Sequence, residues 1–124
     1  MDWIHLPHDH GQNSQKILAH VPQEEMFRTV ADHLKLLGDA SRLKIFWILC
    51  HCEECVINLS AMMEMSSPAI AHHLKLLKTA GLVTARREGK EVYYKAAESE
   101  QANLLHDMVE HLMIITCPCA QEQD

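Results

Sequence analysis

Cysteine and histidine are the residues through which this sequence could do chemistry. The chain of 124 residues holds five cysteines and ten histidines. Thiolates and imidazoles are the ligands that zinc and similar ions prefer, and thiols can also be oxidised. Cys52 and Cys55 form a Cys-x-x-Cys pair, a spacing that lets two thiolates bind one ion, and Cys117 and Cys119 form a second pair. Both pairs are therefore candidate metal ligands.

Acids and histidines of the segment 96–116 form another candidate set, namely Glu98, Glu100, His106 and His111. An alternative is that His111 merely pairs with Asp107, four residues before it along a helix. The same holds for His106 and Glu110. Three histidines of the N-terminal stretch, His5, His8 and His10, could complete a ligand shell from an arm.

Cys50 differs from the paired cysteines because it ends an apolar helical run. We expect it to be a buried and unreactive thiol. Five cysteines are an odd number in a chain that begins without an export signal, which favours reduced thiols over a disulfide framework.

Apolar periodicity predicts the elements that must position these residues. Helices are expected over 22–37, 40–50, 56–63 and 96–116, and another begins at Ser67. Ser66 or Ser67 supplies its N-cap, Pro68 suits its first turn, and Gly81 ends it. Two short strands then flank residues 88–90, where Gly89 can adopt the positive φ of a tight hairpin turn.

This order of elements indicates a mainly α (α+β) fold, a winged helix-turn-helix with a two-stranded β-hairpin wing and flanking dimerisation helices. We expect a mobile N-terminal arm over 1–22, a DNA-binding and dimerisation domain over 23–116, and a C-terminal tail over 117–124. The apolar sides of the first and last long helices are expected to pack against a second copy.

Charge is distributed unevenly along the chain. Its net charge is −6, yet residues 68–95 carry six Lys or Arg against two Glu, about +4, which leaves about −10 for the rest. A basic segment on an acidic body is typical of a polyanion-binding face. The residues expected to contact DNA are Ser67, Pro68, Ala71, His72, His73 and Lys75 on the helix, with Arg86, Arg87 and Lys90 on the wing.

Other classes of protein are disfavoured. No apolar run approaches the roughly 20 residues of a membrane span, and the N-terminus lacks the pattern of a signal peptide, so we expect a cytoplasmic protein without a membrane partner. A phosphate-binding glycine loop and a nucleophile-base arrangement are both missing. We therefore expect no enzyme and no small-molecule substrate.

Four motifs in order identify a family. They are LLGDASRLKI (36–45), ECVINLS (54–60), SSPAIAHHLKLLKTAGLV (66–83) and RREGKEVYY (86–94). Over residues 26–112 the chain resembles the ArsR/SmtB family of winged-helix metal-sensing repressors. The resemblance implies a homodimer that represses its operator when metal-free and releases it when a metal ion binds.

Two family motifs are altered here. The thiol motif of the third helix keeps Cys55 but has Ile57 and Asn58 where a second thiol and an acid usually stand, and Cys52 is the candidate replacement. The final-helix motif appears as Glu98, Glu100, His111 and Ile114, of which three can ligate. The resemblance implies that Glu98 and Glu100 of one protomer meet His111 of the other protomer. His106 of that second protomer is a further candidate ligand.

The ion and the signal remain open at this point. Thiolate ligands favour Cd(II), Pb(II), As(III) or Zn(II), whereas His and Glu favour Zn(II), Co(II) or Ni(II), so Zn(II) suits both. One alternative is a redox-responsive repressor in which Cys52 and Cys55 are oxidised. A remote alternative, a thiol-disulfide oxidoreductase, lacks the βαβ context of such enzymes.

Overall fold

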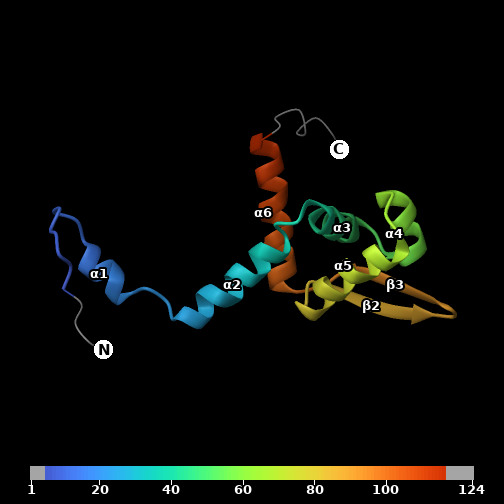
Figure 1. The fold of residues 1–124 in the computed structure, drawn as a ribbon, viewed down its shortest axis with the longest axis horizontal. Helices are drawn as coiled ribbons and strands as arrows, with labels where there is room; N and C mark the ends of the chain where they lie inside the picture. The colour runs from blue at the N-terminus through green and yellow to red at the C-terminus, as the bar shows by residue number, and fades with distance from the viewer. Residues whose placement is uncertain (1–4, 117–124) are drawn as a thin grey trace. The chain divides into compact units, whose positions relative to one another are not determined.

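The computed structural model describes residues 5–116, which form the helices and strands of a winged helix-turn-helix (Figure 1). In chain order the elements are α1 (Ser14–Ala19), α2 (Glu24–Leu36), α3 (Ala40–His51), β1 (Glu54–Cys55), α4 (Val56–Met63), α5 (Ser67–Thr79), β2 (Val83–Glu88), β3 (Glu91–Ala96) and α6 (Glu100–Thr116). The predicted mainly α fold with a β wing is confirmed. The chain divides after Asp32 into two compact units.

The first unit contains α1 and the greater part of α2. Neither helix has a buried residue. Helix α1 lies within the stretch predicted to be an arm. Along α2, the apolar side chains of Met26, Phe27 and Val30 are about half exposed or more. This helix is amphipathic, with an apolar face that the described part of its own chain leaves in water.

The second unit is built on a core shared by α3, α4, α5 and the start of β2. Asp39 begins α3 by accepting a hydrogen bond from the Arg42 backbone N–H at 2.9 Å, as its residue type favours. The fully buried side chains are Ile45, Phe46, Leu59, Ile70, Leu74, Leu77, Leu82 and Val83. Removing these large apolar groups from water stabilises the arrangement of the three helices.

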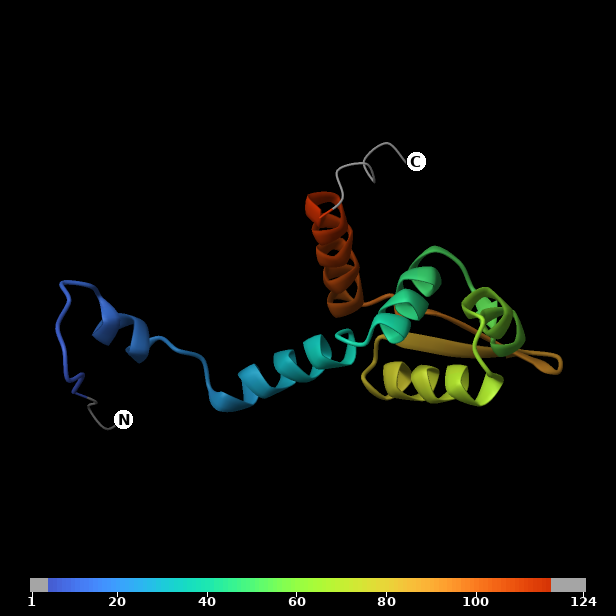
Figure 2. The ribbon, with the colours of Figure 1, turned by 45° about the horizontal axis from the view of Figure 1, so that its top comes forward.

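The wing is a hairpin to which a third short strand is added. Strands β2 and β3 pair antiparallel from Val83↔Ala96 to Glu88↔Glu91, and Gly89 in the two-residue turn has φ +62°, as predicted. The predicted two-stranded sheet is incomplete, because β1 pairs with β3 and the strand order is β1-β3-β2. A strand of two residues has no periodicity by which the sequence could reveal it. Figure 2 shows α5 running alongside the hairpin.

Helix α6 begins at Glu100, four residues later than predicted. Ala96 belongs to β3, and the Ala97 N–H donates to the Leu82 carbonyl at 2.9 Å, so the sheet claims the residues that the pattern assigned to the helix. The Ser99 hydroxyl oxygen accepts from the Ala102 N–H at 3.2 Å and starts α6. Among the described residues, no helix has both the length and the apolar content needed to cross a membrane.

Candidate functional site

The turn between α4 and α5 sets the position of α5. Glu64 ends α4 in the left-handed conformation with φ 54°, and the Ser60 hydroxyl donates to the Met65 carbonyl. Ser66 then accepts a hydrogen bond from the Ala69 N–H at 3.3 Å, which confirms the predicted N-cap. Since Ile70 is fully buried, α5 is fixed to the core along one side and presents its other side to solvent.

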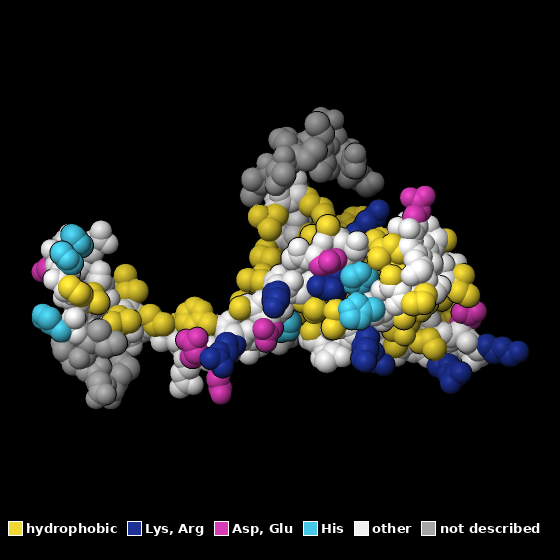
Figure 3. Space-filling model, in the orientation of Figure 1, with side chains coloured by type: hydrophobic (Ala, Val, Ile, Leu, Met, Phe, Trp, Pro, Cys, Tyr) yellow, Lys and Arg dark blue, Asp and Glu magenta, His cyan; other side chains and the backbone are white. Residues whose placement is uncertain are grey.

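The solvent side of α5 carries most of the residues expected to contact DNA. Ser67, Pro68, Ala71, His72 and Lys75 are exposed. His73 is only half-exposed and lies 3.2 Å from an Arg42 guanidinium nitrogen. Burial, opposed by Asp39 and assisted by Arg42, lowers the pKa of His73. His73 therefore helps to hold α5 against α3. Figure 3 shows histidines over α5 and Lys and Arg side chains around it and at the tip of the wing.

Arg86 on β2 is occupied by neighbouring acids. Its guanidinium nitrogens lie 2.6 Å from Glu53 and 2.8 Å from Glu88, and the group stacks over the Tyr93 ring at 4.9 Å. Hydrogen bonds to Glu53 and Glu88 raise the pKa of Arg86, and the bond to Arg86 lowers the pKa of Glu53. Arg86 therefore fastens the wing to the segment before β1.

Three of the Lys and Arg side chains expected to contact DNA are available to bind a polyanion. Lys75, Arg87 and Lys90 are exposed, and their side chains form no ion pair with the described residues. An α-helix with an exposed N-terminal half fits a DNA major groove, and flanking cations fit the phosphates. The geometry of α5 and the wing therefore suits double-stranded DNA.

Known proteins resemble this chain over most of its length. The sequence model of the family described as "Bacterial regulatory protein, arsR family" matches residues 39–85, from the N-cap of α3 into β2. A transcriptional repressor SmtB homolog from Synechocystis is 32% identical over 103 residues, which are 83% of this chain and 78% of the relative. The chain belongs to the ArsR/SmtB family of transcriptional repressors. Members of this family are DNA-binding regulators of transcription.

A second relative and one solved structure support the assignment of this chain to the family. A CadC homolog from Staphylococcus aureus, named as a cadmium resistance transcriptional regulatory protein, is 36% identical over 66% of this chain and 69% of its own. The homodimeric winged helix-turn-helix DNA-binding domain of a Mycobacterium bovis protein is 30% identical, with a TM-score of 0.64 over 74% of this chain and 88% of that chain.

The described thiols of the repressor have different surroundings. Cys52 is exposed, with its thiol 3.4 Å from the Ile48 carbonyl, whereas Cys55 is buried in β1; both are free. Cys50 is half-buried rather than buried, and burial, assisted by Glu110, raises the pKa of its thiol to about 11. The raised pKa favours the protonated thiol, and the expectation that Cys50 is unreactive stays a prediction. Cys117 and Cys119 lie outside the described residues.

The candidate ligands on and before α6 are spread along its length. Glu98 is exposed and pairs with Lys95 at 3.1 Å, and Glu100 is exposed at the helix start. His111 is also exposed, and its Nδ1 lies 2.8 Å from the Asp107 carbonyl oxygen. Because Glu100 and His111 are eleven positions apart, about 16 Å along the axis, they cannot bind one ion within one protomer.

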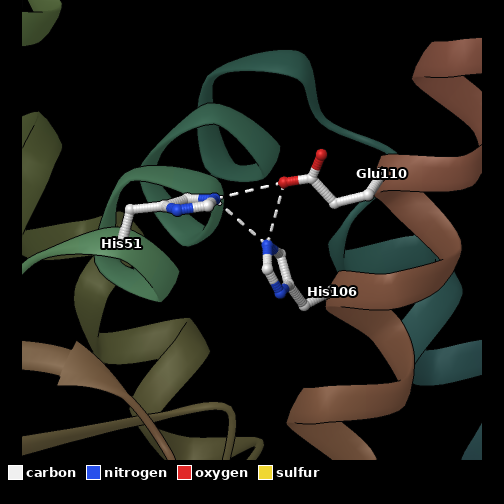
Figure 4. A group of neighbouring side chains, drawn as sticks. All are labelled: His51, His106 and Glu110. Carbon is white, nitrogen blue, oxygen red and sulfur yellow. Dashed lines mark hydrogen bonds and ion pairs between the residues drawn. The ribbon is translucent and has the colours of Figure 1, made fainter. Parts of the chain in front are cut away.

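His106 lies in a cluster that connects α6 to α3. Its Nε2 is 3.0 Å from Glu110 Oε1 and 3.1 Å from His51 Nε2, and His51 Nε2 is 3.1 Å from the same oxygen (Figure 4). The Trp47 indole N–H also donates to that oxygen at 3.0 Å. The alternative of a helical pair between His106 and Glu110 is confirmed, with His51 and Trp47 added from α3.

Electrostatics favour the ionised form of Glu110. Burial opposes ionisation of this carboxyl group, but the hydrogen bonds from His51, His106 and Trp47 outweigh it and lower the pKa of Glu110.

Sequence reasoning did not identify His51 or Trp47 as partners. The spacing of His106 and Glu110 predicted only their own contact, since the packing of α6 on α3 cannot be read from either helix alone.

The described residues hold one group of three side chains whose ligand atoms converge, namely His51, His106 and Glu110. Cys52 and Cys55 do not join such a group within the described part of one protomer. Nor do His5, His8 and His10 of the first unit, where the rings of His8 and His10 stack at 5.7 Å.

Proposed function

We propose that the protein is a metal-responsive transcriptional repressor that binds operator DNA as a homodimer and is released when a metal ion binds. The observation that carries this proposal is the exposed side of the N-terminal half of α5, beside the cations Lys75, Arg87 and Lys90, which form no ion pair with the described residues. Side chains of α5 would read base edges, and these cations would neutralise phosphates. Operator binding would then be tight at low salt and weaker as salt increases.

Unpartnered apolar faces support the homodimer. On α6, Leu104 is 69% exposed and Leu112 is 53% exposed, and α2 exposes Met26 and Val30. Apolar faces of this kind are costly to leave in water, and a second copy would cover them by a two-fold interface. The related Mycobacterium bovis domain is named as a homodimer. Two copies of α5 would then meet successive major grooves of one operator.

Candidate ligands for the sensed ion lie on both sides of the DNA-binding elements. They are Cys52 and Cys55 before α4, Glu98, Glu100, His106 and His111 around α6, and Cys117 and Cys119 in the tail. The α6 set suits an ion held between protomers, since the axial separation of Glu100 and His111 would be cancelled if two α6 helices ran antiparallel. The exposed thiol of Cys52 suits a soft ion.

Zinc is the ion that both ligand chemistries accept, and we favour Zn(II), with Cd(II), Pb(II) or As(III) as thiolate-selecting alternatives. The CadC relative is named for cadmium resistance. A bound ion would supply a fixed link between its ligands. If that link fits the DNA-free arrangement better, metal and operator weaken each other's binding by one common factor, about 5 to 150-fold for typical allosteric couplings.

The test is operator affinity measured with and without each ion. Fluorescence anisotropy of a labelled operator duplex is titrated with the dimer in the presence of Zn(II), Cd(II), Pb(II), Ni(II) or As(III). We expect at least one ion to weaken binding by about tenfold or more. If no ion changes the operator affinity, the metal-sensing part of the proposal fails while DNA binding stands.

Substitutions separate the two ligand sets. Cys55→Ser removes a thiol and His111→Ala removes an α6 ligand, and the variant that abolishes the ion's effect identifies the sensing set. Lys44→Ala, an exposed change on α3 away from both sets, is the matched control. Release by a mild oxidant without any ion, with loss of titratable thiols, would replace the metal proposal by the redox alternative.

A further inference from the structure

Three potential ligand atoms from two helices meet at one point between α3 and α6. His51 Nε2, His106 Nε2 and Glu110 Oε1 form a triangle with sides of 3.1, 3.1 and 3.0 Å. Figure 4 shows both imidazole rings directing the same nitrogen toward the carboxylate. A helical pair between His106 and Glu110 needs only those two residues. The contact of His51, which belongs to α3, with both of them therefore requires a further explanation.

Hydrogen bonding alone accounts poorly for this triangle. Glu110 Oε1 is approached by both imidazoles and by the Trp47 indole, although one carboxylate oxygen offers about two lone-pair sites. The two imidazole Nε2 atoms are also 3.1 Å apart, a distance at which two protonated nitrogens repel. A cation placed between the three atoms would attract all three lone pairs at once.

The dimensions fit a first-row divalent ion. Zinc binds His nitrogen and carboxylate oxygen at about 2.0–2.2 Å, so neighbouring ligands of a tetrahedral ion are about 3.3–3.6 Å apart. The observed sides are shorter than that edge by about 0.2–0.6 Å. An ion would lie roughly 1 Å out of the plane of the three atoms, and small side-chain shifts would complete the geometry.

We propose that His51, His106 and Glu110 form a divalent-cation site within each protomer, suited to Zn(II) and to its spectroscopic substitute Co(II). Two imidazoles and one carboxylate are a borderline donor set that these ions accept. The site differs from the set divided between protomers, because all three ligands belong to one chain and His111 is not among them.

A fourth ligand has room to bind. His51 and His106 line a cavity of about 310 Å³, which Cys50, Cys52 and Glu98 also line. This volume holds several waters, each of which occupies about 30 Å³, so a water can complete a tetrahedral shell. The His51 side chain is 44% exposed, which leaves a path for the ion from solvent.

Trp47 is the positioning residue of this site. Its indole N–H donates to Glu110 Oε1 at 3.0 Å, and its ring packs against His51 with centroids 4.2 Å apart. Groups that hydrogen-bond a ligand fix its orientation, and their loss typically weakens metal binding about 10 to 100-fold. Trp47 therefore holds both the carboxylate and the α3 imidazole in place.

The test uses the full-length reduced dimer without DNA. In a Co(II) titration we expect visible d–d absorption of a four-coordinate ion with nitrogen and oxygen ligands, separate from the near-ultraviolet charge-transfer band that a thiolate site would add. With Zn(II), we expect imidazole nitrogen-15 spectra in which the Nε2 signals of His51 and His106 shift to metal-bound positions while the signal of His20 stays unchanged.

Variants make the assignment specific. His51→Ala and Glu110→Gln should each weaken Co(II) binding at the nitrogen and oxygen site by at least about 100-fold, and Trp47→Phe by about 10-fold. Asp107→Asn, an exposed change on α6 three positions before Glu110, is the matched control and should leave this site unchanged. Glu110→Gln keeps the side-chain shape, so it tests the site even if His51→Ala fails to fold.

Two results would overturn the inference. One is a Zn(II)-saturated dimer in which neither His51 nor His106 is metal-bound; the other is loss of the Co(II) bands in His111→Ala but not in Glu110→Gln. Any effect of this site on operator release rests on the proposed function. The site itself is measured without DNA, so its failure and the failure of metal-responsive repression are distinguishable.

Discussion

Arg86 and Arg87 are neighbours in β2, but their side chains have different ion-pair partners. Arg86 is held by Glu53 and Glu88, whereas Arg87 forms no ion pair with the described residues. We predict that Arg87→Ala removes a phosphate contact and that Arg86→Ala does not. Sequence reasoning placed both residues among the DNA contacts, so this pair of variants tests what the structure adds.

The salt dependence of operator binding gives the magnitude. Each neutralised phosphate contributes about −0.9 to the slope of log affinity against log salt concentration. One Arg87 per protomer makes two in a homodimer, so Arg87→Ala should make the slope shallower by about 1.8. When the salt concentration is raised from about 50 to 200 mM, the factor by which operator affinity falls should be about tenfold smaller for Arg87→Ala than for the unmodified protein.

Arg86→Ala should behave differently. Its charge is already compensated by two carboxylates, so the slope should stay nearly unchanged, while loss of the Glu53 contact loosens the wing and lowers affinity by a similar factor at every salt concentration. The assay is anisotropy of a labelled operator over a series of NaCl concentrations, with Lys44→Ala as control. Equal slope changes for Arg86→Ala and Arg87→Ala would refute the reasoning.

Three further predictions concern the scaffold. The hydrogen bond from the Arg42 N–H lowers the pKa of Asp39 below its ordinary 3.8. The stabilisation of the fold by the Asp39 carboxylate is therefore complete above pH 3.8 and is lost as the pH falls below it. The difference in urea midpoint between the unmodified protein and Asp39→Ala should shrink over the same range of pH. Gly89→Ala places a side chain at φ +62° and should cost about 1–2 kcal/mol in urea unfolding, without steric contact as the cause. Cys50, with a pKa of about 11 against an ordinary 9.0, should be alkylated at pH 8 about 100-fold more slowly than a cysteine in a short peptide, as mass spectrometry would measure.

Local signals in the sequence predicted helix α5 and the turn of the wing well. The Ser66 cap, the buried stripe of Ile70, Leu74 and Leu77, and the positive φ of Gly89 are each determined by a few adjacent residues. Such features depend on backbone preference and on one apolar face, both of which are visible in a short window. Helix α3 likewise begins at Ala40, as predicted, directly after Asp39, which caps it.

Contacts between distant segments were not predictable in the same way. The two residues of β1 pair with β3 across about forty positions of sequence, and no periodicity marks so short a strand. Glu53 directly precedes β1, and it contacts Arg86 at 2.6 Å. The meeting of His51 with His106 and Glu110 similarly depends on how α6 packs on α3, which neither helix encodes alone.

The short strand β1 also affects the thermodynamics of DNA recognition. A two-stranded hairpin by itself is only marginally stable in water, whereas a third strand and the clamp between Glu53 and Arg86 keep this wing ordered before any ligand arrives. Ordering a loose segment on binding consumes part of the interaction free energy. A wing that is already ordered would lose little conformational entropy at an operator, so the phosphate contacts proposed for it would contribute more fully to affinity.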